Sequence, residues 1–215
     1  LLLEQGSIHT IGEPADVVHE YLNLLFSNEI GQVTTDLASD DGLEHEENGL
    51  ISNRDIDGCS LHPSYNHAEY RWGDQRGVIQ DYLLTVNGEQ AGVVCNSGDA
   101  VDLLLRVIYR EDVLNPILGL TVKTADGIVV YGANTRDRKL EVPAGKAGSE
   151  LLVRYRFPIS LIGGDYFISV GLADDDEHKD NLAVDRRYDM IHLQVRSEQG
   201  DFGIAALNMD MSVED

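Results

Sequence analysis

The sequence is poor in cysteine and in basic residues. Its two cysteines, Cys59 and Cys95, are too few for a disulfide scaffold and fit no zinc motif, so both are expected to be reduced thiols. The 215 residues include 16 Lys and Arg against 38 Asp and Glu, a formal net charge of −22. Such acidity argues against binding DNA, RNA or an anionic membrane through a broad charged surface. It is compatible with a neutral ligand, with an anionic ligand held by local arginines, or with simple solubility or salt adaptation.

Common catalytic motifs and long apolar runs are also missing. There is no G-x-x-x-x-G-K-[ST] phosphate loop, no G-x-S-x-G elbow and no H-E-x-x-H zinc motif. No segment approaches the length of a membrane span, and no signal peptide is visible. Carboxylate pairs are so numerous that none can be singled out as a glycosidase dyad. The acidic run 174–177 lacks the spacing of a calcium loop and predicts a solvated hairpin tip. We therefore expect a binding protein with no cofactor or metal.

Three zones differ in composition along the chain. Residues 1–27 predict two short strands and a helix that opens after Pro14, since apolar residues then recur at helical spacing. Residues 28–68 are acidic with few apolar residues at any period, which predicts an irregular or disordered linker that buries little surface. Histidines expected to be exposed in or beside this linker, rather than metal-bound, are His45, His62 and His67. Residues 69–215 have a different, two-residue period.

In this last zone apolar and polar residues alternate as in half-buried strands. The run 101–110 is expected to turn five side chains inward: Val101, Leu103, Leu105, Val107 and Tyr109. The same pattern recurs in 150–157, 166–172 and 191–195. Further candidate strands are 76–86, 90–95, 117–124, 127–132 and 201–209. Turn sequences such as Asn87-Gly88 separate them, and eight or more short strands predict an all-β, antiparallel sandwich.

The alternation also places polar and aromatic side chains on the outward faces of these strands. If the strands share a sheet, the outward face is a polar groove with arginine forks and one exposed ring, suited to a sugar and to a phosphate or carboxylate on it. The candidate ligand-binding residues are Arg106, Arg110, Arg154, Arg156, Phe167, His192 and Gln194. The alternative is that Arg154 and Arg156 only neutralise carboxylates on neighbouring strands. Trp72, the single tryptophan, either plugs one end of the sandwich or stacks on a sugar.

Two parts of the chain resemble parts of one kind of transport protein. Residues 1–22, with G-x-I-x-x-x-G before a helix that opens after proline, are similar to the end of an ABC-transporter ATPase domain. The motif order Glu69-Tyr70-Arg71-Trp72-Gly73, Y-G-x-N-T (131–135) and L-x-x-G-x-Y (161–166) resembles the C-terminal domain of Wzt-type proteins, the nucleotide-binding subunits of ABC exporters for O-antigen polysaccharide. This second resemblance covers nearly all of residues 69–196. The chain begins without Met and in mid-element, which predicts a fragment cut from a longer ATPase subunit.

The resemblance implies an immunoglobulin-like or jelly-roll sandwich that binds the exported glycan, often at its modified non-reducing end. It implies a homodimer with exchanged C-terminal strands, and the Gly hinge after Gln199 suits such an exchange. ATP and Mg would bind the absent ATPase domain, through which the full protein meets a transmembrane subunit. The expected location is the cytoplasmic face of the inner membrane of a Gram-negative bacterium. The rival interpretation is a dimerisation or regulatory module of the ATPase with no glycan site, whereas an accessory domain of a glycan-modifying enzyme conflicts with the ATPase-like tail.

Overall fold

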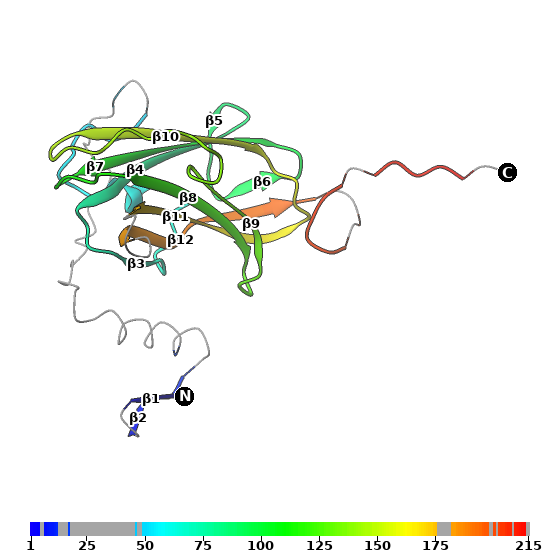
Figure 1. Ribbon diagram of the computed structural model, residues 1–215. Coiled ribbons are helices and arrows are strands. Elements are labelled where there is room, and N and C mark those ends of the chain that lie inside the picture. The colour runs from blue at the N-terminus through cyan, green and yellow to red at the C-terminus, as the bar shows by residue number, and fades with distance from the viewer. Residues whose placement is uncertain are drawn as a thin grey trace.

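Two sheets, almost entirely antiparallel, pack face to face in the main body of the chain (Figure 1). The computed structural model describes residues 1–4, 7–12, 17, 46, 49–175, 182–197, 200, 202–207 and 209–213. The four-stranded sheet has the order β10 (Glu150–Pro158), β7 (Ala100–Tyr109), β4 (Gly77–Val86) and β5 (Glu89–Gln90). The six-stranded sheet has the order β3 (Tyr70–Trp72), β12 (Leu182–Arg196), β11 (Gly164–Asp174), β8 (Pro116–Thr124) and β9 (Val129–Asn134), with β6 (Val94–Asn96) parallel to β12. The predicted all-β sandwich is confirmed.

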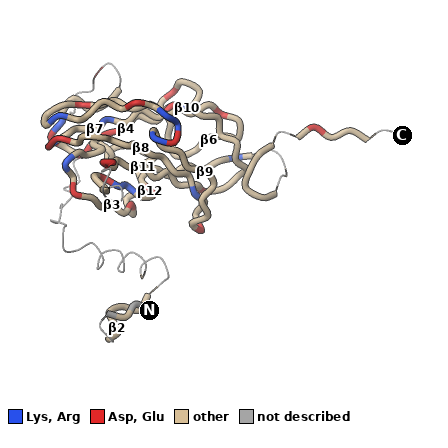
Figure 2. The backbone as a smooth tube through the Cα atoms, in the orientation of Figure 1, with Lys and Arg blue, Asp and Glu red and all other residues tan. Residues whose placement is uncertain are grey.

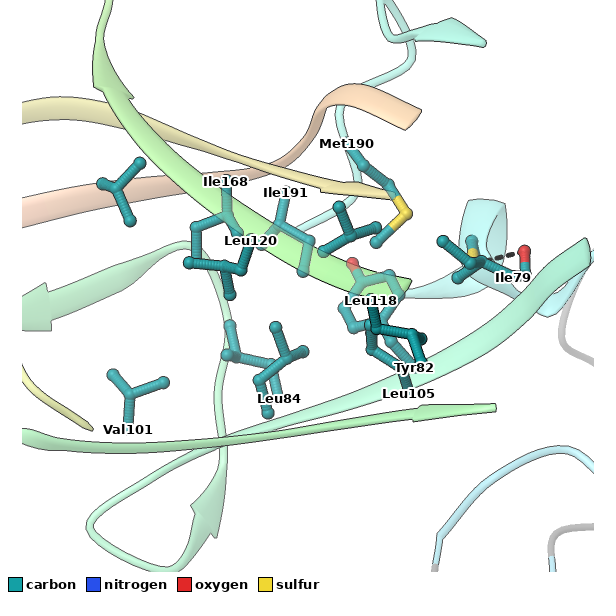
Figure 3. Packing of buried hydrophobic residues seen from close by; sticks show 14 of the residues in the cluster. Ile79, Tyr82, Leu84, Val101, Leu105, Leu118, Leu120, Ile168, Met190 and Ile191 are labelled. Carbon is teal, nitrogen blue, oxygen red and sulfur yellow. Dashed lines mark hydrogen bonds between the residues drawn. The ribbon is translucent and has the colours of Figure 1, made fainter. Parts of the chain in front are cut away.

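The core lies between these sheets and follows the predicted alternation. The inward residues of β7 are 0–2% exposed: Val101, Leu103, Leu105, Val107 and Tyr109. Figure 3 shows Leu84 and Leu105 of one sheet packed toward Leu118 and Leu120 of the other. Because the two-residue period of a strand sends every second side chain to one face, these runs bury a continuous apolar layer.

Turn chemistry sets the register at the β4–β5 hairpin. Asn87 and Gly88 have φ of 52° and 85°, the left-handed backbone that a two-residue hairpin turn requires at both central positions. Two other expectations need correction. The predicted strand 90–95 is divided between β5 and β6, and the predicted strand 201–209 is absent from the described residues of that range, where only Ala205 forms a bridge, to Leu161.

The N-terminal zone is described only in part. Strands β1 (Leu2–Glu4) and β2 (Ser7–Thr10) are the two short strands predicted there, and the structure pairs them as an antiparallel hairpin. The helix expected after Pro14 and the acidic zone up to residue 45 lie outside the described residues, apart from Val17, which is helical. The assignment of this zone to an ATPase domain stays a prediction. Within the described part of the chain, no helix has the length and apolarity to cross a bilayer.

Residues 49–69, here called the strap, pack against the sandwich, and the expectation that the linker buries little surface is wrong for them. Leu50 and Ile51 are 0% and 1% exposed and lie on the outer face of the four-stranded sheet, where Ile51 N donates to Asp81 at 2.7 Å. The strap then forms a short 3-10 helix, η1 (Gly58–Leu61), before β3. A few isolated apolar residues are enough to dock it, which no periodic pattern reveals.

The strap also changes the expected surroundings of His62 and of both cysteines. His62 is 8% exposed and its Nε2 lies 2.7 Å from Asp81 Oδ1, so the prediction that it is exposed is wrong, whereas His67 is exposed as predicted. Cys59 and Cys95 are free and buried. Burial raises the pKa of the Cys95 thiol to about 11 and raises that of Cys59 as well, which keeps both protonated and unreactive.

The burial of Leu50 predicts that the strap contributes to global stability. Leu50→Ala is expected to lower the free energy of unfolding by about 2–4 kcal/mol because it leaves a cavity under the strap. The matched control is Leu114→Ala, whose side chain is 63% exposed and whose loss should stay within about 0.5 kcal/mol. Urea denaturation of both variants measures the difference, and equal values would contradict docking of the strap.

Candidate functional site

The seven predicted ligand-binding residues do not form one groove. Four of them belong to the four-stranded sheet or its continuation: Arg106, Arg110, Arg154 and Arg156. The other three belong to the six-stranded sheet: Phe167, His192 and Gln194. The two sets point to opposite outer faces of the sandwich, so the hypothesis that they share a sheet is wrong.

The arginines of the four-stranded sheet are mostly committed to the protein itself. Arg106 faces outward as alternation predicts, yet it is 0% exposed because the strap covers it, and it donates to Ile51 O and to Glu46 at 2.6 Å. Arg154 and Arg156 are exposed and lie 3.4 and 2.8 Å from Asp102 Oδ2 on the neighbouring strand β7. These two therefore form the cross-strand ion pairs of the alternative interpretation. Arg110 is exposed just beyond the end of β7.

The other three residues lie on the outer face of the six-stranded sheet. Phe167 and His192 are directly opposite each other in register, and their rings stack with centroids 5.0 Å apart and an interplanar angle of 18°. His192 Nε2 lies 2.8 Å from Asp165 Oδ1, and Gln194 is exposed on the same strand. The patch combines an aromatic surface with polar groups, as predicted.

A hollow of about 350 Å³ opens on this same face, where β8, β9, β11 and β12 run side by side. We call it the groove. Its polar lining consists of Thr121, Asn134, Asp137, Ser169, Arg186 and Tyr188. Three glycines also line the groove, namely Gly119, Gly132 and Gly171. Side chains at these positions would stand out from the sheet, so the glycines are what leaves the groove open.

Arg186 lies along the floor of the groove. A Cβ at Gly171 would be 2.9 Å from both Cδ and Nη1 of Arg186, so the arginine side chain crosses the strand at the glycine. Among the described residues, Arg186 has no carboxylate partner and no side-chain hydrogen bond. The nearby cation Lys123, in contrast, pairs with Asp189 at 2.8 Å. The groove therefore holds one positive charge that is available to a ligand.

Aromatic side chains border the groove on the side of Arg186. Tyr188 is 38% exposed and stacks on Tyr70 of β3, with ring centroids 6.2 Å apart and planes 20° apart. Trp72 is opposite Arg186 in the β3–β12 register and is partly exposed. Of the two roles open for the tryptophan, this position on the groove side of β3 favours contact with a ligand over plugging the end of the sandwich.

A buried ionic cluster fixes the strands that carry these groove residues. Arg187 is 1% exposed and donates to Asp57 at 3.0 Å and to the Glu69 carboxylate at 2.5 and 3.0 Å. Arg71 forms a two-bond fork with Asp185, both at 2.8 Å, and also contacts Asp57. Figure 2 shows acidic and basic positions intermingled at this end of the sandwich. The cluster joins the strap to β3 and β12 directly behind Arg186 and Tyr188.

Sequence reasoning missed Arg186 and Tyr188 because β12 extends farther than its alternation indicates. The strand begins at Leu182, but its first half interleaves charged residues that are buried, Asp185 and Arg187, with residues that face the groove. Asp189, with φ of 57°, then breaks the register before the apolar alternation of 191–195. The adjacent pair Arg186-Arg187 is the one indication in the sequence, because two neighbouring residues of a strand point to opposite faces.

Asp174, the last residue of β11 and the first of the acidic run 174–177, differs from its expected role. Asp174 is 7% exposed, and its carboxylate accepts from the backbone N–H of Asn115 at 2.8 Å and of Leu114 at 3.4 Å. It fixes the start of β8 rather than forming a solvated tip. Residues 176 and 177 of the run lie outside the described residues. In the described part of the chain, no three His, Cys, Asp or Glu side chains gather as a metal site would require.

The fold and the sequence match a known family. The family model described as the Wzt C-terminal domain matches residues 68–207. The chain belongs to this family. A crystal structure of the C-terminal domain of Wzt is similar to it, with 27% identity, a TM-score of 0.68, and coverage of 74% of this chain and 96% of that one. Membership confirms the resemblance predicted for residues 69–196. It also supports, in general terms, a non-catalytic carbohydrate-binding role related to an ABC exporter.

Two other comparisons add nothing to this assignment. The CARDB domain of PF1109 from Pyrococcus furiosus is 9% identical over 54% of this chain and 94% of that one, and its TM-score of 0.30 carries no argument. No curated protein matches the chain.

The ionic cluster predicts a pH-dependent effect of Asp57→Asn. Burial alone would raise the pKa of Asp57, but the charges of Arg187 and Arg71 outweigh it and lower that pKa. The charged carboxylate therefore stabilises the fold at neutral pH, and this contribution is lost as the pH falls through the lowered folded-state pKa. At pH ~7 the variant should lose about 1–3 kcal/mol, less than the ~3–5 kcal/mol of a fully buried pair, because the Asp57 side chain is 26% exposed.

Urea denaturation as a function of pH measures this effect. The difference between wild type and Asp57→Asn should shrink as the pH is lowered below the ordinary aspartate pKa of ~3.9. Asp112→Asn is the control, since Asp112 and its partner Lys146 are both exposed and solvent screens the pair, so its loss should change stability far less. A pH-independent difference for Asp57→Asn would show that the carboxylate charge is not what holds the strap.

Proposed function

We propose that the groove on the six-stranded sheet binds the polysaccharide of an O-antigen ABC exporter, at its modified non-reducing end. The observation that carries the proposal is the position of Arg186, a half-buried arginine with no carboxylate partner among the described residues, in a chain of net charge −22. It lies on a glycine floor beside an exposed tyrosine. Family membership supports carbohydrate as the class of ligand.

The groove offers the kinds of contact that a sugar needs. Tyr188 and Trp72 present aromatic surface to the apolar C–H face of a sugar ring. Thr121, Asn134 and Asp137 provide donors and acceptors for hydroxyl groups. The Arg186 guanidinium suits a phosphate or carboxylate through two parallel hydrogen bonds, and a substituent of that kind would mark the end of a chain.

The rest of the transport role belongs to parts of the protein beyond the sandwich. In this proposal residues 1–27 are the C-terminal end of an ATPase domain that binds ATP and Mg, and that domain contacts the transmembrane subunit of the exporter. The sandwich selects the glycan at the cytoplasmic face of the inner membrane of a Gram-negative bacterium. It does so without chemistry of its own.

We further propose that the chain is a homodimer in which the C-terminal segment of one copy extends onto the other. A second hollow, apolar and of about 380 Å³, lies where β8, β9 and β10 approach each other, and its lining includes Val122, Phe157 and Leu161. Ala205 also borders it, and the segment that follows exposes Leu207 (82%) and Val213 (97%). An exposed apolar tail beside an open apolar hollow favours exchange between copies. A purely dimerising or regulatory module is the alternative function.

Binding measurements separate the two functions. Arg186→Ala should weaken binding of O-polysaccharide from the organism of origin by about tenfold or more, since charge-assisted hydrogen bonds contribute roughly 1.5–3 kcal/mol. Tyr188→Ala should weaken it several-fold. The Arg154→Ala, Arg156→Ala double variant is the control and should bind like wild type, because these residues lie on the other sheet. Calorimetry against polysaccharide of an unrelated serotype tests selectivity, and absence of binding to the cognate glycan would favour the regulatory alternative.

Deleting residues 200–215 tests the proposed exchange. The intact chain should elute as a dimer in size-exclusion chromatography with light scattering, and the truncated chain as a monomer, since the exchanged segment is gone. Removing only residues 214 and 215 should leave the dimer unchanged. A dimer that survives the longer deletion would contradict exchange through this segment.

A further inference from the structure

A separate hollow lies on the strap side of the sandwich, away from the groove. It has a volume of about 210 Å³ and is formed by residues 54–57 of the strap together with β3, β4 and the end of β7. At ~30 Å³ per water, this is room for about seven waters. It is smaller than the roughly 300–1,000 Å³ of sites for drug-sized ligands, and so suits a single small molecule.

The lining of this hollow is divided between polar and apolar groups. Its polar residues are Arg54, Asp55, Asp57, Arg71, Gln80 and Arg110. Its apolar residues are Ile56, Val78 and Ile108, of which the last two are directly opposite each other in the β4–β7 register. A ligand here would meet apolar side chains as well as hydrogen-bonding groups.

The charges of the lining nearly cancel. Arg54 pairs with Glu46 at 2.8 Å and Glu150 at 2.7 Å, and Arg71 is held by Asp57 and Asp185. The side chains of Arg110 and Asp55 have no ion pair or hydrogen bond with any described residue. One free cation and one free anion therefore remain, and they favour a neutral ligand that both donates and accepts hydrogen bonds.

Gln80 provides an independent sign of a missing partner. Its side chain is buried, with 5% of the residue exposed, and its amide nitrogen donates to Asn53 O at 3.4 Å. Its amide oxygen is buried and accepts from no group in the described part of the chain. A buried acceptor without a donor is unfavourable. Because this oxygen is closed to solvent, a ligand hydroxyl in the hollow would reach it after the Gln80 amide rotates toward the hollow that the residue lines.

We propose that this hollow is a second saccharide site, which binds one neutral hexose unit. Sugar hydroxyls act as donors and acceptors at once, which matches the free Arg110 guanidinium, the free Asp55 carboxylate and the Gln80 amide oxygen. The apolar residues Ile56 and Ile108 face the C–H groups of the ring. This site shares no lining residue with the groove, so the two can be tested separately.

Methyl NMR of the intact chain tests the site directly. D-glucose, D-galactose and D-mannose are added separately, with inorganic phosphate as a fourth probe, and the methyl resonances of Ile56 and Ile108 are followed. At least one hexose should shift both methyls in a saturable manner. Arg110→Gln and Gln80→Met should each reduce its affinity about fivefold or more, because the first removes the charged guanidinium fork and the second removes the amide.

Arg186→Ala serves as the matched control. It should leave the hexose titration at Ile56 and Ile108 unchanged while weakening polysaccharide binding in the groove, so failure of one site is distinguishable from failure of the other. The proposal is overturned if no hexose shifts the two methyls, if the shifts keep their affinity in both Arg110→Gln and Gln80→Met, or if phosphate alone produces them.

Discussion

The structure depends on keeping a buried arginine paired. Arg187 is 1% exposed, and a guanidinium taken out of water is tolerated only when carboxylates and carbonyls take the place of its hydration. Asp57 and Glu69 of the strap and the carbonyl of Ile79 on β4 fill this role together. The requirement explains why an acidic, non-repetitive segment is ordered against the sandwich. It also makes the strap part of the domain rather than a tether to whatever precedes it.

The same constraint shapes the groove on the other side of the strand. Adjacent residues of a strand point to opposite faces, so the cluster residues Asp185 and Arg187 alternate with the groove residues Arg186 and Tyr188. On β3, Arg71 alternates with Tyr70 and Trp72 in the same way. The ion pairs on the inner side of β3 and β12 therefore fix the backbone that carries the groove side chains. Preorganisation of this kind lowers the entropic cost of binding a flexible glycan.

Alternation predicted the faces of the strands but not what lies over them. The inward residues of β7 and the outward direction of Arg106 followed from the two-residue period, and both were right as geometry. The strap covers Arg106 because Leu50 and Ile51 dock it on the sheet. These two apolar residues lie in an acidic stretch that has no hydrophobic periodicity, so the sequence pattern does not predict their burial. The local pattern also does not predict which sheet a strand joins, because strand pairing is long-range. β10 pairs with β7, whereas β11 pairs with β8. Arg154 and Phe167 were therefore grouped in one groove although they lie on opposite faces.

Net charge bears on which glycan the groove would accept under the proposed function. The net charge of −22 repels a polyanion over about one Debye length, which is ~8 Å at physiological salt. A glycan charged along its whole length would therefore be repelled at every sugar unit that lies outside the groove. Arg186 offers compensation for only one anionic group. A mostly neutral polysaccharide with a single charged substituent satisfies both conditions, and a chain that is modified only at its end would be of this kind. Under the proposed function, the one unpaired arginine that lines the groove among the described residues makes recognition of a single charged group at a terminus more favourable than recognition of charges along the repeat.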